Sequence, residues 1–188
     1  MKMDAAEFAS LVAGRQAMVY SIAWNYLHDT ALAEEIAQEA FLELHRCLPR
    51  IESEAHAANF LRRVAAHRAI DEGRRRRWQS RAGLEDVAEP VAEPAAGDPM
   101  LDRALHRLVD GLPGRSRMIV ILRFQEDLEP AEIAQILEIP LGTVKSNLHR
   151  SLKVLRKRLE HPDRPLSSRD RNQNLRSRDR KGVVGVNP

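Results

Sequence analysis

Apolar residues recur at steps of three and four along most of this chain, and that spacing limits the fold more than any other feature. The pattern covers about residues 4–27, 30–48, 58–77, 101–112 and, after a break at Pro113 and Gly114, 115–125, and it places apolar side chains on one face of each helix. The chain has only four Phe, two Trp and two Tyr, whereas β-strands are enriched in aromatic residues. The run 118–122 (MIVIL) is the one segment that fits a strand as well as a helix. The sequence therefore predicts an all-α protein.

One acidic segment interrupts the helical pattern and predicts how the chain is divided. Residues 82–99 hold three Pro and two Gly and carry only negative charge, and both Pro and like charges extend a chain. We expect a flexible acidic linker there, joining an N-terminal helical bundle over 1–81 to a second small helical domain over 100–160. The last segment, 161–188, repeats the tetrapeptide S-R-D-R and lacks an apolar stripe, so we expect a disordered basic tail.

The positive charge is concentrated in two blocks. The formal net charge of the chain is only +3, yet residues 61–81 sum to +6 and residues 141–160 to +5. The acidic segment lies between them. This distribution predicts two separate contacts with a polyanion such as a nucleic acid.

Residues 129–159 have the pattern of a helix-turn-helix. Pro130 suits the first turn of a short helix, a turn follows at 138–140, and a longer helix begins near Leu141. The second helix of this motif enters the major groove of DNA. We expect an inward stripe of Val144, Leu148, Leu152, Leu155 and Leu159. The opposite, cationic face carries Gly142, Lys145, Ser146, His149, Arg150, Lys153, Arg156 and Lys157. A merely solvated basic helix is the alternative.

Two helices of the first half each carry one sign of charge on one face. The cationic face of the helix near 58–77 consists of Asn59, Arg62, Arg63, His67, Arg74 and Arg77. It is expected to line a nucleic-acid groove, in which Phe60 and Trp78 either stack on bases or pack internally. The acidic face of the preceding helix consists of Glu34, Glu35, Gln38, Glu39 and Glu43. That face would repel DNA, so it either binds a basic protein partner or is simply solvated.

The residues that metal sites and enzymes need are not grouped in this sequence. Cys47 is the single cysteine, so no internal disulfide and no multi-cysteine metal site can form. Glu34, Glu35 and Glu39 lack a Glu-x-x-His partner for a di-iron bundle, and no Gly-rich phosphate loop is present. No apolar run approaches the roughly 20 residues of a membrane span, and the first ten residues lack the apolar core of a signal peptide. We expect a cytoplasmic protein that is not an enzyme and holds no metal or cofactor.

Three segments together resemble the bacterial sigma-70 family of promoter-specificity subunits of RNA polymerase. The helix with which that family binds core polymerase is similar to DTALAEEIAQEAFLELHRCLPRI (29–51). The helix that recognises the −10 promoter element is similar to NFLRRVAAHRAIDEGRRRR (59–77). The domain that reads the −35 element is similar to residues 112–159. Two domains joined by one linker resemble the extracytoplasmic-function (ECF) class of the family.

The resemblance implies three sets of functional residues. The helix that docks on the β′ clamp of polymerase would use Asp29, Glu35, Ile36, Gln38, Glu39, Phe41 and Leu42. The melted −10 strand would be captured by Asn59, Phe60, Arg62, Arg63, His67, Arg74, Arg75 and Arg77. The −35 element would be contacted by Arg115, Arg123, Gly142, Thr143, Lys145, Ser146, His149, Arg150 and Lys153.

The resemblance also implies the partners. These are core RNA polymerase, through its β′ clamp and β flap, and promoter DNA, with no insertion into a membrane. The acidic linker would follow the RNA path of polymerase. Members of the ECF class are often held inactive by an anti-σ factor, although no feature of this chain identifies one.

Several positions depart from the family pattern. Phe60 replaces a common Trp and His67 a common Asn in the −10 helix, and His45 replaces a Trp near the end of the docking helix. Glu138 stands where the helix-turn-helix usually has Gly, which predicts strain if a positive φ is kept. Pro140 replaces the usual N-cap Ser.

A helix-turn-helix repressor or activator is the alternative interpretation. It would account for residues 129–159 but not for the cationic and acidic helices of the first half. It usually requires a dimer and a palindromic site. A sigma factor instead predicts an asymmetric promoter of two elements.

Overall fold

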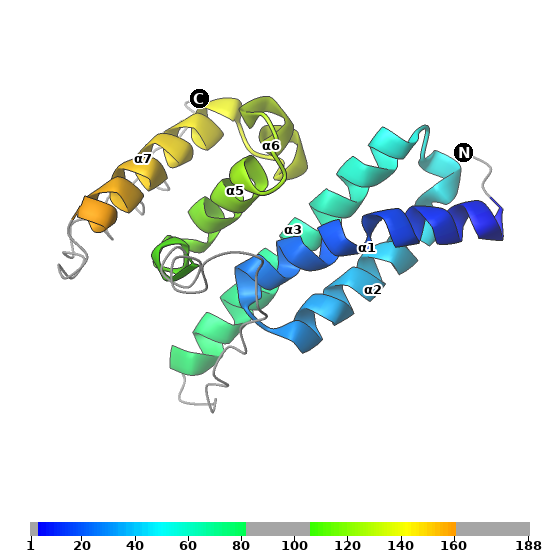
Figure 1. Ribbon diagram of the computed structural model, residues 1–188, viewed down its shortest axis with the longest axis horizontal. Helices are drawn as coiled ribbons and strands as arrows, with labels where there is room; N and C mark the ends of the chain where they lie inside the picture. Colours follow the sequence, from blue (N-terminus) through cyan, green and yellow to red (C-terminus); the bar gives the residue numbers. More distant parts are fainter. Residues whose placement is uncertain (1–3, 82–105, 161–188) are drawn as a thin grey trace, which may run out of the picture.

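The computed structural model describes residues 4–81 and 106–160, and every regular element in these ranges is a helix (Figure 1). The first half is a three-helix bundle of α1 (Ala5–Leu27), α2 (Thr30–Cys47) and α3 (Glu54–Arg81). A short 3-10 turn, Leu48–Arg50, follows α2. The expected linker over 82–99 and the expected tail over 161–188 lie outside the described residues.

The second half consists of shorter helices that end in one long helix. Residues 106–110 are helical and precede α5 (Gly114–Phe124), α6 (Pro130–Ile136) and α7 (Leu141–Glu160). The ambiguous run 118–122 lies within α5, and all five of its side chains are buried. The all-α prediction is therefore confirmed for the described part of the chain.

Local sequence signals explain where the first helices begin. Asp4 and Glu7 form a capping box at the start of α1, and Asp29 caps α2 as its position before Thr30 predicts. The predicted start of α3 at Ala58 is wrong by four residues. The Ser53 hydroxyl accepts a hydrogen bond from the His56 amide at 3.1 Å, so the chain turns into the helix at Glu54. The predicted end at Arg77 is also early, because α3 continues to Arg81.

The inward face of α7 differs from the predicted stripe in its second half. Val144 is fully buried as expected, but Leu152 and Leu159 are 46 % and 63 % exposed. The buried position is Ser151, one residue earlier, which is 2 % exposed on a helix that packs against α5 and α6. Arg158 then donates to the carbonyl oxygen of Leu108 at 2.7 Å. The leucine stripe is therefore rotated toward the surface along the last turns of α7.

The two halves pack against each other. Helices α1 and α3 contact α5, and α3 also contacts α6, so that α5 lies beside α3 in Figure 1. One cluster of buried residues includes Ile22 and Leu61 from the first half and Met118 and Ile133 from the second. No helix within residues 4–81 and 106–160 has both the length and the apolar character needed to cross a membrane.

Candidate nucleic-acid interface

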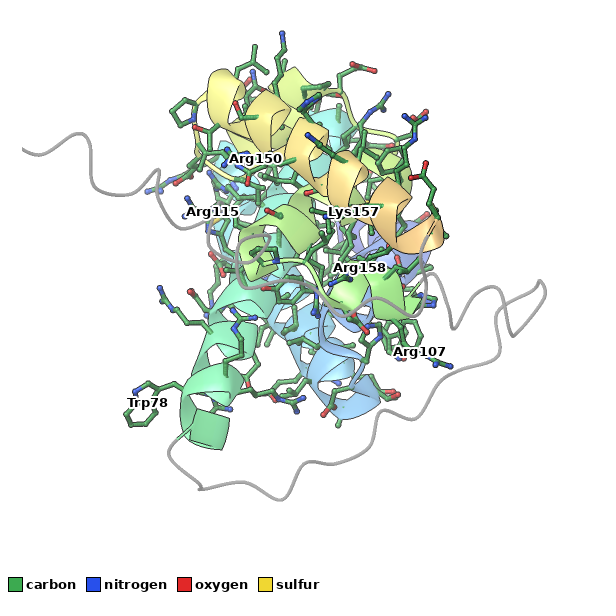
Figure 2. The ribbon with its side chains drawn as sticks, turned by 90° about the vertical axis from the view of Figure 1, so that its left-hand side faces the viewer. Trp78, Arg107, Arg115, Arg150, Lys157 and Arg158 are labelled. Atoms are coloured by element: carbon green, nitrogen blue, oxygen red, sulfur yellow. The ribbon has the colours of Figure 1, made fainter. Side chains whose placement is uncertain are left out.

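Helix α7 presents its predicted cationic face at the surface. Gly142, Lys145, Ser146, His149 and Lys153 are exposed, and Thr143 and Arg150 are half-buried. The Ser146 hydroxyl donates to the Gly142 carbonyl at 2.7 Å, and Arg150 Nε donates to the Ser146 carbonyl at 3.0 Å. These bonds lay both side chains along their own helix. Figure 2 shows Arg150 and Lys157 on this helix.

A polar contact between α5 and α7 fixes the rotation of the cationic face. The buried Ser116 hydroxyl donates to Asn147 Oδ1 at 3.0 Å, and Asn147 Nδ2 donates to the Thr143 carbonyl at 2.7 Å. The sequence alone did not predict this pair. Only tertiary packing brings α5 and α7 together, and neither Ser116 nor Asn147 is of a residue type that indicates such a contact. Buried polar groups of this kind are normally hydrogen-bonded, and here they orient the helix above the core.

The turn before α7 has the backbone strain that the sequence predicts. Glu138 has a φ of 52°, a conformation that costs a residue other than glycine about 1 kcal/mol. The turn is closed by the Ile139 amide, which donates to the Ala134 carbonyl at 3.0 Å. With Pro140 in the usual N-cap position, the Thr143 amide donates to the Pro140 carbonyl at 2.8 Å. The helix-turn-helix geometry therefore forms despite both departures from the family pattern.

The two arginines expected at the backbone phosphates differ in their surroundings. Arg115 is exposed at the start of α5 (Figure 2). Arg123 is 30 % exposed and lies 3.2 Å from Asp127 and 3.5 Å from Glu129. It also donates to the Leu128 carbonyl at 3.3 Å. Arg123 is therefore engaged by the turn between α5 and α6 in this conformation.

The cationic face of α3 is covered in part by the second half of the chain. Arg62 pairs with Glu126, Arg63 with Glu138, and His67 Nε2 lies 3.1 Å from the Ile136 carbonyl. Asn59 is exposed, whereas Phe60 is only 8 % exposed and lies beneath Arg63, whose Cζ is 5.3 Å from the ring centroid. The structure thus brings these five residues together on one face but leaves little room for DNA there.

The arginine run at the end of α3 pairs mainly with carboxylates of its own helix. Arg74 lies 3.0 Å from Asp71, and Arg75 lies 2.8 Å from Glu72. Arg77 is exposed. Trp78 is 69 % exposed and points away from the rest of the molecule in Figure 2, so its indole does not pack internally.

The acidic face of α2 is partly neutralised by α3. Glu39 lies 2.8 Å from Arg68, an ion pair that sequence analysis did not foresee because the two residues are far apart in the chain. Glu35 and Gln38 are exposed. Leu42 is 57 % exposed, an unusual position for a large apolar side chain.

Three other residues of the expected polymerase-binding set have different environments. Ile36 is 5 % exposed and belongs to the core, so its side chain does not reach the surface of α2. Phe41 and Gln38 line a groove of about 420 Å³ between α1 and α2. Asp29 caps α2 and accepts a hydrogen bond from Arg76.

Comparisons with known proteins cover both halves of the chain. The family model for Sigma-70 region 2 matches residues 11–79, and the model for Sigma-70, region 4 matches residues 102–155. The RNA polymerase sigma factor SigV of Bacillus subtilis is 30 % identical over 144 residues, which are 77 % of this chain and 86 % of the relative. The ECF RNA polymerase sigma factor SigW of the same species is 29 % identical over 171 residues, 84 % of this chain and 91 % of that one.

A solved structure shows the same fold. It is the sigma factor RpoE of Bartonella quintana in complex with the anti-sigma factor NepR, with a TM-score of 0.69 and 17 % identity. The likeness covers 84 % of this chain and 98 % of that one. The two family models and the two Bacillus relatives show that the chain belongs to the sigma-70 family, in its extracytoplasmic-function class.

The chain is accordingly an RNA polymerase sigma factor, whose family partners are core polymerase and promoter DNA. The alternative of a separate helix-turn-helix regulator is not favoured. Such a regulator would not account for the helices of the first half, whereas the Sigma-70 region 2 model matches residues 11–79.

Proposed function

We propose that this sigma factor binds its partners through three surfaces: α7 binds the −35 element, α3 binds the −10 strand and α2 binds core polymerase. In this proposal residues 1–81 and 100–160 act as separate domains tethered by the acidic segment 82–99, and 161–188 is a dispensable basic tail. The observation that carries the proposal is the cationic face of α7, exposed on the second helix of a helix-turn-helix.

The −35 element is assigned to Gly142, Thr143, Lys145, Ser146, His149, Arg150 and Lys153, with Arg115 and Arg123 on flanking phosphates. Lysine, arginine, serine and histidine provide the donors that base edges in the major groove and phosphate oxygens accept. Lys145, Ser146 and His149 are exposed on the first turns of α7, which is the part of a recognition helix that meets base edges.

The −10 strand is assigned to the α3 face of Asn59, Phe60, Arg62, Arg63 and His67 and to the arginines Arg74, Arg75 and Arg77. Unpaired bases stack on planar side chains, and phosphates pair with guanidinium groups. The stacked arrangement of Arg63 over Phe60 provides both kinds of group at one place. The exposed indole of Trp78 extends this surface.

Core polymerase is assigned to the exposed part of α2, with Glu35, Gln38 and Leu42 at its centre and Glu39 and Phe41 beside them. An exposed apolar side chain surrounded by carboxylates suits a partner surface that is basic around an apolar pocket. In this proposal Asp29 and Ile36 act indirectly, since one caps α2 and the other packs beneath it.

We further propose that the protein acts in the cytoplasm with polymerase and has no catalytic activity of its own. Core polymerase would supply the chemistry of RNA synthesis. The Bartonella sigma factor of the same fold is described in complex with an anti-sigma factor, and we propose that an anti-σ partner also regulates this chain.

Run-off transcription from a library with randomised −35 and −10 elements tests the assignment of the surfaces. The unmodified protein should enrich one sequence at each element. Lys145→Ala with Arg150→Ala should lose the enriched −35 sequence and keep the −10 sequence. If the double variant enriches the same −35 bases as the unmodified protein, α7 does not read that element.

A further inference from the structure

Asn147 lies in the second turn of the recognition helix α7, but its side chain is engaged inside the protein. Asparagine commonly reads adenine in the major groove, because its amide oxygen and nitrogen bond the base at the same time. In this chain both ends of the amide already have partners. Oδ1 accepts from the Ser116 hydroxyl at 3.0 Å, and Nδ2 donates to the Thr143 carbonyl at 2.7 Å. The amide of Asn147 therefore holds α7 in place instead of facing a base.

The hydroxyl that holds Asn147 belongs to a buried residue at the start of α5. Ser116 is 2 % exposed, and Met118 and Ile119 beside it are fully buried. A buried hydroxyl that loses its partner has a desolvation cost, so the bond is favoured over an open arrangement. Arg115, the residue before Ser116, is exposed and is assigned to a backbone phosphate. The bond thus connects a phosphate anchor, which fixes the register on DNA, to the helix that reads the bases.

The apolar contacts of α7 do not define its rotation as narrowly as this bond does. Val144 is fully buried, and Leu148 packs against the core cluster. Hydrophobic attraction is non-directional, so these side chains hold α7 on the core over a range of rotations. A hydrogen bond requires a donor–acceptor distance of about 2.7–3.2 Å and a nearly linear angle. The bond between Ser116 and Asn147 is therefore the contact that selects one rotation of α7.

A small rotation of α7 would affect bases more than phosphates. Side-chain atoms at the surface of a helix lie about 5–6 Å from its axis, so a rotation of roughly 20° moves them by about 2 Å. That displacement breaks a hydrogen bond to a base edge. The long side chains of Lys145 and Arg150 still reach phosphate oxygens, because charges attract each other over longer distances. Base reading is thus lost by a rotation that leaves phosphate binding intact.

We propose that Ser116 and Asn147 are positioning residues for recognition of the −35 element. Their hydrogen bond sets the rotation of α7, and neither side chain touches a base. The inference rests on the proposed role of α7 at that element. It assigns part of the sequence specificity to a buried serine on a different helix. Without the bond, the protein keeps its general affinity for DNA and loses its preference for one −35 sequence.

Ser151 provides a matched control on α7 itself, one turn after Asn147. It is also 2 % exposed, but its hydroxyl has no hydrogen-bond partner in the described part of the chain. Ser116→Ala and Ser151→Ala each remove one buried hydroxyl, and only the first removes a bond. Ile133→Val on α6 is a second control. It trims a fully buried side chain, which lowers stability without altering the Ser116–Asn147 pair.

The experiment measures specificity and affinity separately, on core polymerase reconstituted with each full-length variant. The DNA is a duplex library with a randomised −35 element and with the −10 sequence that the unmodified protein enriches. Sequencing of the bound templates gives the enrichment of the preferred −35 sequence over the library mean. Filter binding of the unsorted library gives the general affinity, and thermal unfolding of each variant gives its stability.

The inference predicts that Ser116→Ala and Asn147→Ala each reduce the enrichment about tenfold, which is the loss that one misread base pair causes. The double variant should lose no more than either single variant, because the two residues act as one unit. The affinity for the unsorted library should change by less than about twofold, because the phosphate contacts remain. Ser151→Ala and Ile133→Val should keep the enrichment of the unmodified protein.

Three results would overturn the inference. The first is unchanged enrichment in Ser116→Ala; the assignment of α7 survives it if Lys145→Ala with Arg150→Ala still reduces the enrichment. The second is a further loss in the double variant, which would show that Asn147 reads a base itself. The third is an equal loss in either control, which would show that lost stability is the cause. If no variant of α7 changes the enrichment, both the inference and the assignment of α7 to the −35 element are wrong.

Discussion

Asp29 joins the start of α2 to the far part of α3 through a hydrogen bond with Arg76, 47 residues later in the chain. Asp29 Oδ2 accepts from Arg76 at 2.5 Å, while Oδ1 accepts from the Leu32 amide at 2.9 Å. These groups favour the ionised carboxylate. The Leu32 amide first, and Arg76 next, hold the pKa of Asp29 below its ordinary value against the opposing effect of burial.

Replacing Asp29 should reduce stability in a way that depends on pH. Asp29→Ala removes the cap and should cost about 1–2 kcal/mol of unfolding free energy at pH 7. The pKa of Asp29 is lower in the folded chain than the value of about 3.9 in the unfolded chain. The ionised carboxylate therefore contributes fully to the free energy of unfolding at a pH above the unfolded pKa. This contribution is lost as the pH falls through the folded pKa. Urea unfolding of Asp29→Ala and the parent from pH 7 to pH 3 measures it. A difference that does not shrink on acidification would contradict the account.

Two glycines in helices should respond oppositely to alanine. A Cβ on Gly73 of α3 would lie 2.8 Å from Cε1 of Tyr26, whose side chain is 1 % exposed and cannot move aside. Gly73→Ala should therefore destabilise the protein by about 1–3 kcal/mol. A Cβ on Gly14 of α1 would meet nothing within 4 Å, so Gly14→Ala should stabilise by about 0.5–1 kcal/mol. Thermal unfolding of both variants is the measurement, and shifts of the same sign would show that Tyr26 is not packed as described.

The exposed acidic side of α2 should control the capture of polymerase. Glu35→Lys reverses a charge that faces solvent and should reduce recovery of core polymerase in a pull-down severalfold, because like charges then face each other. Adding Glu39→Lys should reduce recovery further, although it also breaks the ion pair with Arg68. Glu160→Lys, an equal charge change at the exposed end of α7, is the control. Undiminished capture by Glu35→Lys would mean that this face is merely solvated.

The cationic side of α7 should determine the salt dependence of DNA binding. Each phosphate contact contributes about −0.9 to the slope of log K against log salt, so Lys145→Ala with Arg150→Ala should flatten the slope by about 1 to 2. Arg107→Ala alters an exposed charge outside the proposed surfaces and should leave the slope unchanged (Figure 2). Filter binding to a promoter fragment between 50 and 200 mM salt, roughly the range over which such contacts weaken, is the measurement. An equal slope for the double variant and the parent would argue against α7 as the DNA surface.

Apolar periodicity and capping residues are enough to predict a helix that is stabilised by residues close to it in the sequence. The first residues of α1 and α2 follow from Asp4 and Asp29, whose side chains cap the first turns. The extension of α3 to Arg81 was missed because an arginine run suggests a helix end. In the folded chain this run is stabilised by pairs with Asp71 and Glu72 within the same helix.

Features that depend on contacts between distant elements could not be predicted in this way. The burial of Ser151 and the exposure of Leu152 depend on how α7 packs on the rest of the second half, which no single-helix pattern contains. The pairing of Arg62 with Glu126 depends on how the two halves pack, and that information lies in neither helix alone. The cationic faces were therefore predictable as surfaces, whereas the groups that cover them were not.

Run-off transcription with purified core polymerase and a randomised promoter library tests the central claim most directly. With the sigma factor present, the account predicts transcripts from templates that share one asymmetric pair of sequence elements. With core polymerase alone, it predicts that the transcribed templates share no such pair. Transcription that remains at the core-only background on every template, with the sigma factor free of any inhibitor, would contradict it.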